Sequence, residues 1–414
     1  MPATSRSTTG PKRSSRTPRI STTRLPPTTD GRRLFAAAAL LAAAGAGGAW
    51  PRPLAAQQFW RNTLYPYVYY SSIDGLWGAI HFSEYSPIGY LERPEPNRAA
   101  ATLEVSASTQ GSYLILADAQ APAWWEGWRA ALTFSAARSN RLGYYGLGNA
   151  TVYFADSVTA ARPYFYKVSR TSQTARTTVQ RRLVGPLRLL VGAEFQRTDF
   201  RELPGESIFG RDHATGVVDS STVPFTDKVV RAGVVVDLRD NEIDPHRAVF
   251  AEALYARGTG YRRTTAAARL YVHPTERLIL GARLAGERMS GAPPVAAQMV
   301  MESSEQPYIA VGGYRSLRGY YDARFTGPGK LLAGVEVRYA LVWAPSVLEL
   351  KLVGFYDAGR VFDAGQPVKI AGTGVHKAGG IELAVRLLRN SLIVVGWGKG
   401  SEGSQLLFGS TWSY

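Results

Sequence analysis

The sequence contains no cysteine, which excludes disulfide bonds, cysteine nucleophiles and thiolate metal sites. Charged residues are few, at 19% of the 414 positions, whereas aromatic residues reach 11% and glycine occurs 42 times. This composition is too apolar and too aromatic for a disordered chain. Beyond residue 56 the sequence also lacks an apolar run of the ~18–20 residues that a membrane-spanning helix needs.

Acidic residues are outnumbered, which gives a formal net charge of +16. Half of this excess lies in residues 1–56, where nine basic residues and one acidic residue contribute +8 and leave +8 for the rest of the chain. The remaining charge is moderate and scattered along the sequence. We therefore expect no nucleic-acid partner, because such proteins gather their basic residues on one face.

The first residues have the layout of an export signal. A polar basic stretch precedes an apolar run from Leu34 to Ala49, and small residues lie just before Gln57. This order predicts a signal peptide with a long basic leader over 1–56. A membrane anchor is the alternative, although the apolar run is short for one. We expect 57–75 to be a short periplasmic segment and 76–414 to be the main domain.

The main domain is rich in segments that alternate between apolar and polar residues. Between 330 and 343, apolar side chains occupy one face of the expected strand and Glu336 and Arg338 occupy the other. The same pattern recurs at 229–240, 277–287, 348–357 and 380–387. It predicts a transmembrane antiparallel β-barrel with lipid outside and a polar lumen. A soluble β-sandwich is the alternative, but its solvent face rarely keeps so many glycine and alanine residues.

The connections between these segments differ in length. Short turns alternate with longer polar stretches near 140–160, 201–226, 289–328 and 363–375, and short turns on one side with long loops on the other are typical of outer-membrane barrels. We count at least fourteen strands, and 57–75 and 99–121 offer room for two more.

The longest loop contains a glycine-rich turn, Gly312-Gly313-Tyr314-Arg315-Ser316-Leu317-Arg318-Gly319-Tyr320. Glycine permits close backbone approach, and an arginine buried in a lumen needs carboxylate partners. Alternation places Glu336 and Asp357 on the lumen faces of the next two strands. We therefore expect the loop to fold inward and Arg318 to bind both carboxylates. A surface loop with a solvated arginine is the alternative.

These residues resemble the bacterial surface-antigen barrel superfamily, which includes Bam- and Tam-type assembly factors and two-partner-secretion transporters. The family marker is a Val/Leu-Arg-Gly-Phe/Tyr turn on a long loop inside a sixteen-stranded barrel, here Leu317, Arg318, Gly319 and Tyr320. Three further family patterns match: Gly334-Val335-Glu336, Phe355-Tyr356-Asp357-Ala358-Gly359, and the strand-turn motif containing Asp237, Arg239, Asp240 and Asn241.

The end of the sequence resembles the signal by which outer-membrane barrels are recognised for assembly. We expect Gly409, Trp412 and Tyr414 to lie in a closing strand, with Leu406, Phe408, Trp412 and Tyr414 on one face. The resemblance then implies the barrel-assembly machinery as a partner during biogenesis. In contrast, we expect none of the periplasmic docking domains that family members usually carry, because only residues 57–75 lie between the predicted leader and the expected barrel.

The sequence offers no constellation for covalent chemistry. Its five histidines lack the spacing of a metal site, and no nucleophile elbow or phosphate loop is present. We therefore expect no enzyme activity, no metal and no cofactor.

The resemblance implies an integral outer-membrane protein, which would reach the outer membrane after export through the inner membrane. It also implies that the protein inserts other proteins into the outer membrane or translocates them across it. The expected partners are the lipid bilayer and client or partner proteins. A passive channel and a secretion pore for one partner protein are the alternatives.

Overall fold

A computed structural model describes residues 60–71, 74–88, 93–344, 347–370, 372–387 and 391–414. They belong to one compact unit, Gln58–Tyr414. The predicted signal peptide over 1–56 lies outside the described residues.

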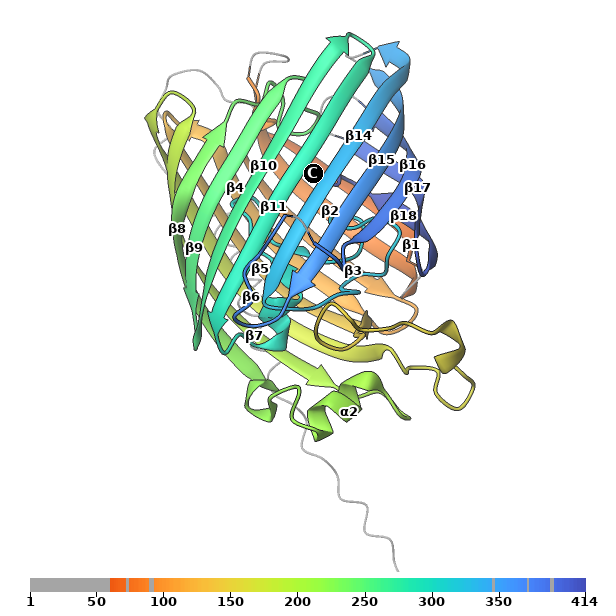
Figure 1. Cartoon of the computed structure of the whole chain (residues 1–414). Helices are drawn as coiled ribbons and strands as arrows, with labels where there is room; N and C mark the ends of the chain where they lie inside the picture. The colour runs from red at the N-terminus through yellow and green to blue at the C-terminus, as the bar shows by residue number, and fades with distance from the viewer. Residues whose placement is uncertain (1–59, 72–73, 89–92, 345–346, 371, 388–390) are drawn as a thin grey trace, which may run out of the picture. The chain divides into compact units, whose positions relative to one another are not determined.

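The unit is built from one antiparallel sheet of sixteen strands in which neighbours in sequence pair with each other. The order is interrupted only between β11 and β14, where β12 and β13 form a separate two-stranded ladder. Figure 1 shows the tilted strands side by side around the unit. The strands are β1 (Arg61–Ser71), β2 (Gly75–Pro87), β3 (Asn97–Ser108), β4 (Tyr113–Trp125), β5 (Trp128–Gly143), β6 (Lys167–Val184), β7 (Leu187–Arg201), β8 (Phe225–Asp237), β9 (Ala248–Gly258), β10 (Tyr261–Thr275), β11 (Leu278–Gly291), β12 (Val300–Met301), β13 (Tyr308–Ile309), β14 (Gly329–Ala344), β15 (Leu348–Phe362), β16 (His376–Leu387), β17 (Ser391–Gly400) and β18 (Gly403–Gly409).

Burial alternates along the strands in the sense that the sequence predicts. In β14, Val335 and Val337 are 54% and 48% exposed, whereas the charged Glu336 and Arg338 are 2% and 0% exposed. Apolar side chains therefore face outward and charged side chains face inward, the reverse of a soluble protein. The predicted β-barrel with sixteen strands is confirmed, and the soluble sandwich is wrong.

The predicted boundary between a periplasmic segment at 57–75 and the barrel at 76 is wrong. Strand β1 occupies Arg61–Ser71 and pairs with β2 over its whole length. Leu64 and Val68 are 69% and 72% exposed and face outward, but Pro66 and the aromatic residues between them obscure this alternation in the sequence.

The two ends of the barrel differ. The connections 144–166, 202–224 and 292–328 are the longest, and all follow strands that run in the same direction. Long loops mark the extracellular end of outer-membrane barrels, so the turns at the opposite end are periplasmic. Two loops extend beyond the extracellular ends of the strands and carry η1 (Ala155–Ser157), α2 (Ile208–Ala214) and η2 (Ser220–Thr222) (Figure 1). No helix in the described part of the chain is long and apolar enough to cross a membrane.

The third long connection, 292–328, folds inward. It contains α3 (Val295–Gln298) as well as β12 and β13, and many of its side chains are buried. Met301, Val311, Leu317 and Phe325 pack in one hydrophobic cluster with Leu332 and Val361 of the barrel wall. The lumen therefore has a core of its own, built around this loop.

Candidate functional site

The lumenal site centres on Arg318, which is fully buried. Its Nε and Nη2 atoms donate to Asp357 at 2.7 and 2.9 Å, and its Nη1 atom donates to Glu336 at 3.2 Å and to Glu382 at 3.3 Å. The guanidinium also lies 3.8 Å from the centre of the Phe355 ring. The structure thus brings together the predicted residues Arg318, Glu336 and Asp357 and adds Glu382.

The turn that carries Arg318 depends on glycine at close contacts. Gly319 has a φ of 97°, and a Cβ atom there would lie 2.9 Å from backbone atoms of Lys399 in β17. Gly398 provides the matching space, since a Cβ atom at that position would lie 2.8 Å from the amide nitrogen of Gly319. Tyr320 follows, and its hydroxyl group lies 2.9 Å from that of Ser401. The predicted turn therefore packs directly against β17.

A second anchor, which the sequence pattern does not indicate, holds the same loop to another part of the barrel wall. The carboxylate of Glu302 accepts hydrogen bonds from Arg176 at 2.7 Å and from Arg231 at 3.2 Å. The carboxylate of Glu305 accepts from Arg239 at 2.7 Å and from Arg269 at 2.9 Å. The loop is therefore fixed both to β14–β16, through Arg318, and to the wall between β6 and β10.

The strand-turn motif at the end of β8 has two roles. Arg239 donates to Asp237 at 2.9 Å as well as to Glu305, so these residues support the second anchor. Asp240 accepts from the backbone of His246 at 3.0 Å. Asn241 accepts from the backbone of Ile243 and Asp244 and shapes the periplasmic turn.

The predicted arrangement of the C-terminus is wrong. Strand β18 ends at Gly409, and while Leu406 and Phe408 are exposed, Trp412 and Tyr414 are 5% and 6% exposed. A backbone oxygen of Tyr414 accepts from the hydroxyl group of Tyr271 at 2.5 Å.

Interactions in the lumen explain why Trp412 and Tyr414 do not continue strand β18. The indole of Trp412 donates to Asp244 at 3.0 Å and stacks under Arg338, whose guanidinium carbon is 3.7 Å from its ring centre. The ring of Tyr414 lies 4.3 Å from the guanidinium carbon of Arg283. Cation–π contacts of these two buried rings offset the loss of the strand's last ladder bonds.

Asp244, His246 and Glu349 are the one group of three potential metal ligands in the described part of the chain. However, Lys351 lies 2.5 Å from Asp244 and 2.8 Å from Glu349, and Arg386 also contacts both carboxylates. Side-chain cations already neutralise these acids. The group therefore does not resemble a built metal site, and the absence of enzyme activity stays a prediction.

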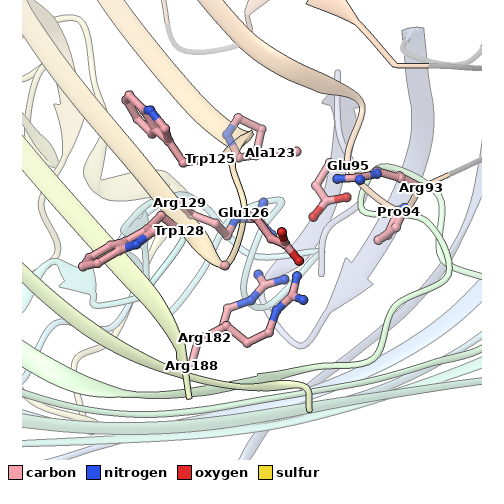
Figure 2. A pocket seen from close by; sticks show the side chains of 12 residues that line it. Arg93, Pro94, Glu95, Ala123, Trp125, Glu126, Trp128, Arg129, Arg182 and Arg188 are labelled. Carbon is pink, nitrogen blue, oxygen red and sulfur yellow. The ribbon is translucent and has the colours of Figure 1, made fainter. Parts of the chain in front are cut away.

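Two adjoining cavities lie at the periplasmic mouth of the lumen. One has a volume of about 400 Å³ and includes Arg239, Arg269 and Tyr414 among its lining residues. The other has a volume of about 290 Å³, and Figure 2 shows Arg182 and Arg188 side by side within it. These two arginines are register partners across the β6–β7 turn. The mouth is therefore rich in arginine.

Comparison with solved structures gives two barrels with TM-scores of 0.53. One is BamA from Haemophilus ducreyi lacking POTRA domains 1–3, with 11% sequence identity over 84% of this chain and 69% of that one. The other is CdiB from Escherichia coli, with 10% identity over 86% of this chain and 62% of that one. This chain thus spans less than two thirds of the CdiB chain. These likenesses support the barrel fold.

No curated protein matches the sequence. A family model does match: the Omp85 superfamily domain aligns with residues 97–400, which include the strand-turn motif, the Arg318 turn and both predicted carboxylate partners. The chain therefore belongs to the Omp85 superfamily.

Proposed function

We propose that this protein inserts client proteins into the outer membrane or translocates them across it, through physical templating rather than covalent chemistry. Membership of the Omp85 superfamily supports the general task. The observation that carries the proposal is the seam between the first and last strands of the sheet.

The seam is weakly closed. The ladder between β17 and β18 runs only from the pair Val394–Gly409 to the pair Gly400–Gly403, so the first residues of β17 have no partner on β18. Among the described residues, no ladder joins β1 to β18. Unpaired strand edges offer backbone donors and acceptors to an incoming strand. An incoming client segment would pair here while the anchored loop keeps the lumen filled.

A passive channel is the second candidate, and the arginine-lined cavity at the periplasmic mouth favours it. The buried loop opposes it, because Arg318, Glu302 and Glu305 hold the loop across the lumen.

The test uses residues 57–414 refolded into liposomes. We expect them to accelerate the folding of a second, unrelated outer-membrane barrel relative to empty liposomes, and we expect Arg318→Ala to lose most of this acceleration. Arg277→Ala is the matched control, since Arg277 is exposed in the periplasmic β10–β11 turn. No acceleration by the wild type, together with ion conductance in the same vesicles, would favour a channel or a secretion pore for one partner.

A further inference from the structure

The outward face of β8, β9, β10 and β11 carries an unusual charge distribution. These four neighbouring strands alternate strictly, and their outward side chains are mostly apolar, such as Val230, Tyr255 and Leu270. Each strand has one exposed cation near its extracellular end: Lys228, Arg257, Arg262 and Arg288. None of the outward positions on these strands is an acid.

The strand registers place the four cations in one band. Arg257 lies directly opposite Arg262, and Arg288 lies opposite Thr264, two residues along β10 from Arg262. Lys228 is likewise two residues from Val230, the register partner of Arg257. Barrel strands tilt by roughly 35–45° from the barrel axis and lie ~4.8 Å apart, so residues at the same depth in the membrane shift along the strand from each strand to the next. The two-residue shifts between these cations follow that tilt. Charges that are scattered in the sequence thus come to one level of the membrane.

This band has no compensation within the described part of the protein. Among the described residues, none of the four cations has a carboxylate oxygen within 4.0 Å. Arginine on a lipid-facing surface is tolerated best near the interface, but like charges directly opposite each other still destabilise a sheet. The arrangement is therefore costly unless an anion outside the protein neutralises it.

We propose that Lys228, Arg257, Arg262 and Arg288 bind the phosphate groups of a phosphorylated glycolipid in the outer leaflet. The guanidinium group donates two parallel hydrogen bonds in a geometry that matches phosphate, and this favours phosphate as the neutralising anion. The apolar outward residues below the band would contact the acyl chains. This inference is independent of insertion or translocation, because it concerns the lipid-facing surface rather than the lumen or the seam.

The experiment measures equilibrium binding of fluorescent bis-phosphorylated lipid A, and of its dephosphorylated form, to the purified protein in a neutral detergent. We expect the wild type to prefer the phosphorylated lipid, and we expect Arg257→Gln/Arg262→Gln to weaken its binding by roughly tenfold to thirtyfold. The control variant is Arg181→Gln/Arg277→Gln, which removes two exposed arginines at the periplasmic end.

Equal binding of the two lipids by the wild type would overturn the proposal. So would an equal loss of binding in the two double variants. The comparison of the two lipids uses the unaltered protein and therefore does not depend on the variants folding.

Discussion

The guanidinium of Arg318 and the carboxylate of Asp357 form two parallel hydrogen bonds, of 2.9 and 2.7 Å, in a place where neither side chain reaches solvent. One residue comes from the inward loop and the other from β15. The pair therefore fixes the position of the loop relative to the barrel wall.

Replacing Arg318 by alanine removes the shared partner of Asp357, Glu336 and Glu382. Removing one member of a buried ion pair costs roughly 3–5 kcal/mol, because the remaining charges stay desolvated. We expect the loop 292–328 to become sensitive to protease in the folded barrel. Equal protease resistance in the wild type and Arg318→Ala would show that the loop is held by other contacts.

Glu305→Gln tests the second anchor without touching the first. The substitution removes the carboxylate that Arg239 and Arg269 share, so we expect the loop to loosen toward the periplasmic end. Single-channel recordings should then show a higher ion conductance than the wild type. Glu276→Gln, at an exposed position in the β10–β11 turn, should leave the conductance unchanged. Identical conductance in all three proteins would show that the ion pairs of Glu305 do not restrict the passage of ions.

Tyr271→Phe tests the inward position of the C-terminus. It removes one hydrogen bond to Tyr414 and should cost about 0.5–1.5 kcal/mol of unfolding free energy. The end of the chain should also become accessible to carboxypeptidase. The matched control is Tyr339→Phe, because Tyr339 lies on the outward face and is 44% exposed. Faster digestion in both variants would argue against a specific role of the Tyr271 hydroxyl group.

The acid stability of the periplasmic turn depends on Asp244. Burial alone would raise its pKa, but Lys351, His246 and Arg338 lower the pKa from 3.8 to about 2. Because the pKa is lower in the folded state, the stabilisation is complete above about pH 4 and is lost as the pH falls toward 2. Asp244→Asn should therefore lower the thermal midpoint at pH 6, with a difference from wild type that shrinks below pH 4. A constant difference down to pH 2 would contradict this account.

The sequence predicts the centre of the site well, because alternation assigns a face to each strand residue. It places Glu336 and Asp357 in the lumen, and the glycine-rich turn indicates where Arg318 enters. Glu382 also falls on a polar face, but its contact with Arg318 depends on the register between β15 and β16, which no local pattern specifies.

The missed features lie where alternation gives no information. Glu302 and Glu305 belong to a loop without periodicity, so only the excess of inward arginines, such as Arg231 and Arg269, signals that acids must meet them. Trp412 and Tyr414 continue the alternation of β18 in the sequence. Their departure from the strand depends on contacts with Arg338 and Arg283, which are distant in the chain.

The two anchors of the inward loop have a mechanical consequence. Arg318 ties the loop to the wall formed by β14–β16, while Glu302 and Glu305 tie it to the wall between β6 and β10. The loop thus joins two parts of the barrel wall that lie several strands apart in the sheet. Any widening that accompanies an opened seam must stretch it, so the strength of these ion pairs limits how far the circumference can expand.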